Sequence, residues 1–212
     1  MTITNLKSEK TNNIYILLTD TGTLFTRLIK GFTGAPYNHA SLVLDENLEE
    51  IYSFGRKHVH NPLNAGFVKE DIYQGTYRHF PETRCKLLRM SVTEQQRTSI
   101  IKVICEFEKD KNKYRYNLIG LLGILLDMDL QPAHSYFCSQ FVAETLRSSG
   151  IHLWNRPSTL VTPNDFLEHE SVQAVYEGPL YQYPKLDRQR LGRVLKPLYS
   201  AVLFGKRAVS RN

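Results

Sequence analysis

One segment in the first quarter of the chain constrains the fold most strongly, because it has the pattern of two antiparallel strands joined by a turn. Side chains alternate from His39 to Leu44, Asp45–Leu48 has the composition of a turn, and Glu50–Phe54 runs back. The apolar run Ile14–Thr19 and the alternating run Cys85–Val92 predict two more strands. We therefore expect an antiparallel sheet or a small barrel.

Several segments have the periodicity and the end signals of helices. Thr93 and Gln96 form a capping-box pattern at one helix start, and Thr162 followed by Pro163 is typical of another. The predicted helices cover residues 23–31, 94 onward, 117–126, 135–149 and 163 onward. In the second of these helices, the face expected to be buried carries Ile100, Ile101, Ile104 and Cys105. Residues 56–77 have mixed periodicity and predict loops and short strands.

The chain is expected to form one α+β domain with an extension at each end. Its 212 residues are near the size of one ordinary domain. Hydrophobic residues make up 42% and charged residues 23%, a balance that excludes wholesale disorder. No linker divides the chain before about residue 184, so the predicted organisation is a polar segment 1–13, a domain 14–184 and a basic extension 185–212.

The formal net charge of +6 is concentrated in the C-terminal extension. Residues 185–212 hold eight Lys and Arg and the single acid Asp187, which leaves 19 basic and 20 acidic residues in the body. A basic nucleic-acid-binding surface is therefore not expected. Apolar residues recur between these cations at helical spacing, namely Leu191, Val194, Leu195 and Leu198. They predict either a segment that contacts a membrane surface or a partner, or, as we favour, a helix docked on the domain.

Cysteine content and the N-terminal sequence predict a cytoplasmic protein. Three cysteines without a CxxC pair do not make a disulfide framework. The first 13 residues are polar and lack the apolar stretch of a signal peptide. The most apolar run, Leu118–Leu126, is far shorter than the ~20 residues that span a bilayer, and it reads as part of a buried helix.

Among the three cysteines, Cys138 is the candidate nucleophile. It lies at the predicted first turn of a helix, where free backbone N–H groups and the helix dipole favour a thiolate. Cys105 is expected to be buried on the apolar face of its helix, and Cys85 is expected to be a structural residue of its strand.

A thiol nucleophile needs a base within hydrogen-bonding reach, and seven histidines are available. His39 opens a predicted strand and would be well oriented there. The other six lie in loops or polar stretches and read as surface residues: His58, His60, His79, His134, His152 and His169. The pair His58 and His60 is the nearest approach to metal-ligand spacing and lacks further ligands, so no metal site is predicted.

Four motifs together resemble the permuted papain-like superfamily. They are PYNHASLVLD, IYSFGR, YFCSQFVAETLRSSGI and TPNDF, and the resemblance covers roughly residues 14–180. The superfamily includes the YiiX-like proteins and the lecithin–retinol acyltransferase-like proteins, which are relatives of NlpC-like peptidases. In ordinary papain-like enzymes the cysteine precedes the histidine, whereas circular permutation places the histidine strand first, as His39 and Cys138 are ordered in this chain.

The resemblance implies a catalytic Cys138, a base His39 and a third polar group that orients the imidazole. On the expected hairpin Ser53 lies roughly opposite His39 and no carboxylate does, so Ser53 or a backbone carbonyl is assigned the third role. The backbone N–H of Cys138 would serve the oxyanion hole. Tyr37 and Tyr136 are candidates for a second donor, although both also fit as packing aromatics.

Two functions from different classes follow from this assignment. The first is a cysteine hydrolase or acyl transferase, in which the Cys–His pair cleaves an amide, ester or thioester through an acyl-enzyme and requires no metal or organic cofactor. The second is a non-catalytic module on the same fold that binds a lipid or a peptide, which the missing carboxylate favours. The acyl, peptide or lipid substrate is not specified by the sequence.

Overall fold

The computed structural model describes residues 11–22, 36–58, 61–117, 129 and 132–194. The helix predicted over residues 23–31 lies outside this part of the chain. So do the helix predicted over 117–126, apart from Asn117, and the second half of the C-terminal extension.

The central element of the fold is a six-stranded antiparallel sheet with the strand order β4-β3-β2-β1-β5-β8. Its strands are β1 (Thr11–Asp20), β2 (His39–Val43), β3 (Ile51–His58), β4 (Asn61–Glu70), β5 (Arg84–Thr93) and β8 (Gln173–Pro179). The predicted hairpin and both other predicted strands are confirmed. The sheet is open, with β4 and β8 at its edges, so the barrel alternative is wrong for the described residues.

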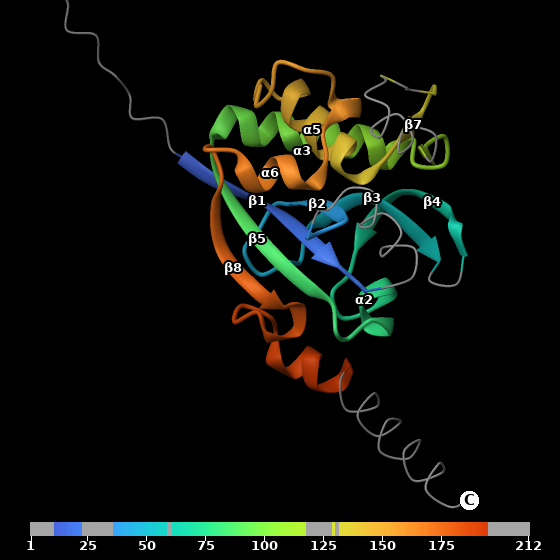
Figure 1. Ribbon diagram of the computed structural model, residues 1–212, viewed down its shortest axis with the longest axis vertical. Coiled ribbons are helices and arrows are strands. Elements are labelled where there is room, and N and C mark those ends of the chain that lie inside the picture. Colours follow the sequence, from blue (N-terminus) through green and yellow to red (C-terminus); the bar gives the residue numbers. More distant parts are fainter. Residues whose placement is uncertain (1–10, 23–35, 59–60, 118–128, 130–131, 195–212) are drawn as a thin grey trace, which may run out of the picture.

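Helices cover one face of this sheet, which makes the domain α+β as predicted (Figure 1). The helices on that face are α3 (Glu94–Lys109), α5 (Cys138–Ser148) and α6 (Pro163–Glu168). The remaining short elements are α2 (Gly75–His79), the 3-10 turns η1 (Ser158–Leu160) and η2 (Leu180–Gln182), and a parallel pair β6 (Arg115–Tyr116) and β7 (Ser135–Tyr136). Within the described residues, no helix combines the length and the apolar character needed to cross a bilayer.

Both predicted helix starts are confirmed. The Thr93 hydroxyl accepts a hydrogen bond from the Gln96 N–H at 3.1 Å, and the Gln96 side chain accepts one from the Thr93 N–H at 2.9 Å. Thr162 caps α6, and Pro163 occupies its first turn, where a missing N–H costs nothing. The helix predicted over 135–149 begins later than expected, at Cys138, because residues 135–136 pair with β6.

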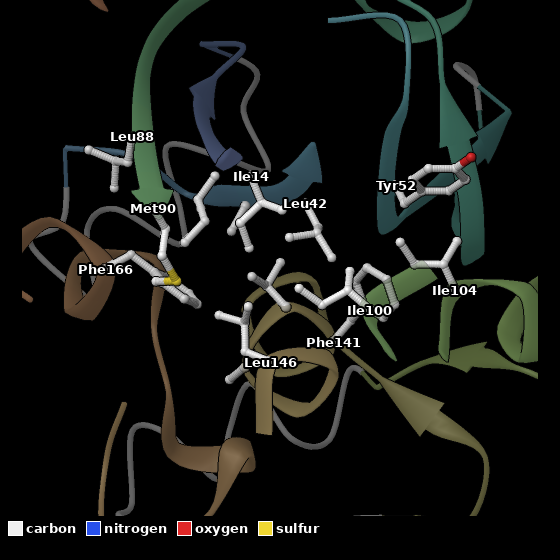
Figure 2. Close-up of a cluster of buried hydrophobic side chains, with 14 of the residues drawn as sticks. Ile14, Leu42, Tyr52, Leu88, Met90, Ile100, Ile104, Phe141, Leu146 and Phe166 are labelled. Atoms are coloured by element: carbon white, nitrogen blue, oxygen red, sulfur yellow. The ribbon is translucent and has the colours of Figure 1, made fainter. Parts of the chain in front are cut away.

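The main core lies between the sheet and the three covering helices (Figure 2). Ile14 and Leu42 project from the sheet toward Phe141 and Leu146 of α5. Phe141 is fully buried, and its ring lies 5.2–5.6 Å from three other aromatic rings, those of Phe54, Phe67 and Phe107. This packing fixes the N-terminus of α5 against the sheet.

The buried face of α3 differs from the predicted one. Ile100 and Ile104 are buried as expected, but the third buried residue is Phe107. Ile101 is 39% exposed and Cys105 is also exposed, so the prediction of a buried Cys105 was wrong. Successive residues are rotated by about 100° around a helix. When Ile100, Ile104 and Phe107 form the buried face, the side chains of Ile101 and Cys105 therefore point toward solvent.

Residues 56–77 form regular structure where loops and short strands were predicted. They contain the end of β3, the ten-residue strand β4, and the short helix α2. β4 pairs along β3 from Ile51 opposite Glu70 to His58 opposite Asn61. Gly55 and Gly66 face each other in this pairing.

A second core covers the opposite face of the sheet and includes the first part of the C-terminal extension. Residues 188–194 are helical, and Leu191 and Val194 are buried in this core together with Leu186. Arg190 donates to Glu49 at 2.8 Å, and its guanidinium lies 3.9 Å from the Tyr73 ring centre. The described part of the extension is therefore docked on the domain.

Replacing Phe141 by alanine should destabilise the protein by about 3–5 kcal/mol, because the cavity left at the junction of three rings cannot close. The free energy of unfolding in urea measures the effect. Ile101→Ala on the exposed side of α3 is the control and should change it by less than about 1 kcal/mol. Equal losses in the two variants would contradict this description of the core.

Shortening the chain at two different positions should show how much the docked helix contributes to stability. A chain that ends at residue 194 should keep Leu191 and Val194 in place, whereas one that ends at residue 186 loses both side chains from the core. Each buried side chain contributes roughly 1.5–3 kcal/mol if its burial is complete. Thermal melting of both proteins tests this, and equal melting temperatures would refute the docking.

Candidate functional site

The structure brings Cys138 and His39 together where α5 meets the start of β2. Cys138 is the first residue of α5 and His39 the first residue of β2, and their side chains are close enough for each to shift the pKa of the other. The backbone N–H groups of Ala40 and Ser139 are also close enough to lower the pKa of the thiol. Its sulfur lies 4.0 Å from the Asn38 carbonyl oxygen.

The other side of the imidazole is held by a carboxylate that the sequence analysis missed. His39 Nε2 lies 2.7 Å from Oε1 of Glu70, the last residue of β4. Because Nε2 is engaged in this way, Nδ1 is the ring nitrogen left to face the thiol. Cys138, His39 and Glu70 thus lie in a row of thiol, imidazole and carboxylate.

Glu70 is itself held by three hydroxyl groups. Ser53 donates to Oε1, while Ser41 donates to Oε2 at 3.1 Å and Tyr77 donates to Oε2 at 2.7 Å. These donors come from β3, β2 and α2, so three neighbouring elements fix one carboxylate. The Glu70 side chain is 11% exposed, which excludes most competing water.

Ser53 does not lie opposite His39, where the sequence analysis placed it. Leu42 pairs with Tyr52, and continuing that register puts Ser53 opposite Ser41 rather than opposite His39. The Ser53 hydroxyl bonds to Glu70, and Glu70 is the group that contacts His39. The expectation that the hairpin leaves His39 without a carboxylate was therefore wrong, because β4 supplies one.

A sequence signal for Glu70 existed, but it depended on recognising β4. Val68 and Glu70 alternate with Phe67 and Lys69 directly before Asp71, as expected for the end of a strand with one buried face. The position of Glu70 beside His39 follows only from the pairing of β4 with β3, in which Glu70 lies opposite Ile51. Because residues 56–77 were predicted as loops and short strands, this pairing and the position of Glu70 were not expected.

Opposing effects act on the His39 imidazole. Burial alone would lower its pKa, but the charge of Glu70 and hydrogen bonds to Cys138 and Glu70 raise the pKa of His39 to about 10. Burial would also raise the pKa of the Glu70 carboxyl, yet His39, Ser53 and Tyr77 lower it below its ordinary value. Near neutral pH the pair is therefore an imidazolium and a carboxylate.

The same pair favours ionisation of the Cys138 thiol. Burial would raise its pKa, but the hydrogen bond and the positive charge of His39, with the N–H groups of Ala40 and Ser139, lower it below the ordinary value. The side chain is 3% exposed, so little solvent screens these interactions.

A tyrosine other than the two candidates contacts the sulfur. Burial and the charge of the nearby Cys138 thiolate raise the pKa of Tyr116 well above its usual value, which places this phenol beside the thiol. Tyr37 instead donates to Glu177 at 3.0 Å, and the Tyr136 ring packs against Phe54 at 5.1 Å. Neither candidate therefore takes the place beside the thiol.

The other cysteines and histidines whose side chains the structure describes lie outside this cluster. Cys85 is buried, as expected for its strand, and burial raises the pKa of its thiol to about 12. His79, His134 and His152 are exposed as predicted. His169 is half-buried and hydrogen-bonds through Nε2 to the Leu153 carbonyl at 2.8 Å. The side chains of His58 and His60 lie outside the described part of the structure.

A cavity of about 260 Å³ opens beside the imidazole. Its wall includes His39, Glu70, Gly55 and Tyr116, but not Cys138. A side chain at Gly55 would begin 3.5 Å from His39 Cε1 and 3.2 Å from the Ser53 hydroxyl, so glycine keeps this side of the imidazole accessible. In the part of the chain that the structure describes, no three His, Cys, Asp or Glu side chains are grouped as metal ligands.

Comparison with models of known protein families finds no match for this chain, and comparison with curated proteins finds none either. The arrangement of the side chains is therefore the basis on which a function can be proposed.

Replacing Glu70 by glutamine should move the reactivity of Cys138 to higher pH. Without the carboxylate, His39 loses its proton at lower pH, so less imidazolium stabilises the thiolate and the thiol pKa rises. The rate of Cys138 alkylation by iodoacetamide from pH 5 to pH 10 measures this, in a Cys105→Ser background that removes the exposed thiol.

The matched control is Glu82→Gln, which removes an exposed carboxylate away from the cluster and should leave the profile unchanged. A profile in Glu70→Gln that coincides with the control would show that Glu70 does not act on the thiol.

Proposed function

We propose that this protein is a cysteine-dependent hydrolase or acyl transferase of the permuted papain-like type, with Cys138 as nucleophile. The observation that carries the proposal is the unbroken chain of contacts from the Cys138 thiol through His39 to the Glu70 carboxylate. A thiol nucleophile needs a base within hydrogen-bonding reach, and a carboxylate bonded to that base holds the imidazole in the orientation that proton transfer requires. The cavity beside His39 gives such a reaction space for a substrate.

The arrangement of elements supports the same superfamily. A cysteine at a helix N-terminus, packed against a strand that begins with the histidine, is what the motif order implied. The antiparallel sheet extends from β2 to the strand that supplies Glu70. The sheet is open rather than closed into a barrel, and Cys138, His39 and Glu70 are nevertheless adjacent.

Acylation would begin with attack of the Cys138 thiolate on the carbonyl carbon of the substrate. The carbon–sulfur bond forms, and the electron pair of the carbonyl π bond moves to its oxygen. When this oxyanion collapses, the bond to the leaving group breaks and the leaving group takes a proton from the His39 imidazolium. A thioester on Cys138 and a neutral His39 remain, with Glu70 still bonded to Nε2.

Deacylation would reverse the roles of these groups. His39 takes a proton from water or from another acceptor, and the acceptor oxygen or nitrogen attacks the thioester carbon. Collapse of the second oxyanion breaks the carbon–sulfur bond and releases the product. The thiolate and the imidazolium are restored, so no net proton is gained or lost by the protein.

Two donors could stabilise the oxyanion. The N–H of Cys138 is in the first turn of α5, where it has no acceptor within the helix. The Tyr116 hydroxyl lies beside the sulfur and could turn to an oxygen on the attacked carbon. Donors fixed in a site of low exposure act with little screening by water.

One observation favours a second function, a non-catalytic module that binds a lipid or a peptide. Cys138 is 3% exposed and does not line the cavity, although His39 does. A ligand could therefore occupy the cavity without contact with the thiol. The two functions differ in whether the sulfur becomes acylated.

Incubation with p-nitrophenyl butyrate should place a butyryl group on Cys138 and release p-nitrophenolate over many turnovers. Intact mass and peptide mapping locate the adduct. Cys138→Ala should lose both signals, with turnover falling by a factor on the order of 10³ or more. The matched control Cys105→Ser changes the exposed thiol and should keep full activity. Turnover that survives in Cys138→Ala would refute the nucleophile, and an absence of adduct in the unaltered protein would favour the binding module.

A further inference from the structure

Two successive cations of β3 line the cavity beside His39. They are Arg56 and Lys57, and side chains of successive strand residues normally point to opposite faces. The pairing of β3 with β4 shifts register between Arg56 and His58, as in a β-bulge. Because a bulge redirects side chains, both cations can reach one cavity.

The acidic groups of the cavity wall are already matched by other cations. Glu70 is bonded to His39, and Asp71 lies 3.7 Å from Arg190. The third cation of the wall, Lys69, is 2.6 Å from Glu50. Lys57 therefore adds a positive charge that the acidic groups of the wall do not match.

Lys57 has a specific resting place on β4. Its Cε and Nζ lie 2.9 Å and 3.2 Å from the position that a side chain at Gly66 would take. The absence of a side chain at Gly66 thus lets the lysine lie across the strand, half-buried at the cavity wall. Among the described residues, no acidic side chain forms an ion pair with the Lys57 ammonium group.

Arg56 brings the second charge close to the reacting groups. It is half-buried, and its guanidinium is near enough to Tyr116 to interact with that phenol, which lies beside the Cys138 sulfur. A planar guanidinium can bind two oxygens of a carboxylate or phosphate at once.

We propose that the cavity selects an anionic substrate, one that carries a carboxylate or phosphate group a short apolar segment away from the scissile carbonyl. The anionic group meets Lys57 and Arg56, and the apolar segment lies against Phe54, Val68 and Ala65 of the same wall. The volume of 260 Å³ holds roughly eight or nine water-sized groups, which limits this part of the substrate to a short chain. The inference rests on the proposed function, because it names the substrate class of the same site.

Three small ligands of similar size test the selection directly: hexanoate, butyl phosphate and hexanamide. We expect the full-length protein to bind one or both anions at least about tenfold more tightly than the neutral amide, since charge-assisted hydrogen bonds are lost with the amide. Dissociation constants come from NMR titration, and protection of Cys138 from iodoacetamide gives a second readout. Comparing hexanoate with butyl phosphate shows whether the site prefers a carboxylate or a phosphate.

Variants then assign the preference to the cavity wall. Lys57→Met should lose most of the preference for the anions, Lys57→Arg should retain it, and the control Lys102→Met on the exposed side of α3 should leave it unchanged. Thermal melting confirms that each variant is folded. Equal affinity for hexanoate, butyl phosphate and hexanamide, no binding of any of them, or a preference that survives in Lys57→Met would overturn the inference.

Failure of the anion preference can be told apart from failure of the proposed acylation of Cys138. If p-nitrophenyl butyrate acylates Cys138 while the anions show no advantage, the reaction stands and the anionic substrate class is wrong. If the anions bind preferentially while Cys138 is never acylated, the anion-binding cavity stands and the protein is a binding module.

Discussion

The buried carboxylate of Glu70 is the interaction on which the arrangement of the site depends. It accepts hydrogen bonds from Ser53, Ser41 and Tyr77 and pairs with His39, so four donors from three strand or helix elements converge on two oxygens. A buried carboxylate without such partners would cost several kcal/mol or become protonated. The donors therefore keep Glu70 charged, and that charge favours protonation of His39, which in turn favours ionisation of Cys138.

The same contacts link the two layers that pack on opposite faces of the sheet. The covering helices lie on one face of the sheet, and α2 with the C-terminal segment lies on the other (Figure 1). Cys138 comes from the first of these layers and Tyr77 from the second. His39 connects them at the start of β2, so the reactive thiol is linked through the sheet to the opposite core.

Local signals in the sequence predicted most of the fold and two members of the site. The hairpin, the capping box at Thr93 and the position of Cys138 at a helix start depend on residues that are close in sequence. Glu70 and Tyr116 could not be found in this way, because their nearness to His39 and Cys138 arises from strand pairing and chain packing. The error at Cys105 has a similar cause, since the ring of Phe107 decided which face of α3 turned inward.

The position of Glu70 at the end of an edge strand has a consequence for the dynamics of the site. β4 pairs in the sheet with β3 alone, whereas β1, which supports His39, is flanked on both sides. Edge strands open locally at a lower free energy than central ones, without melting of the whole domain. Each such opening would release His39 from its carboxylate and would also withdraw the Phe67 ring from its contact with Phe141 in the main core. Amide hydrogen exchange along β4 therefore reports how often the link between His39 and Glu70 is broken more directly than global stability does.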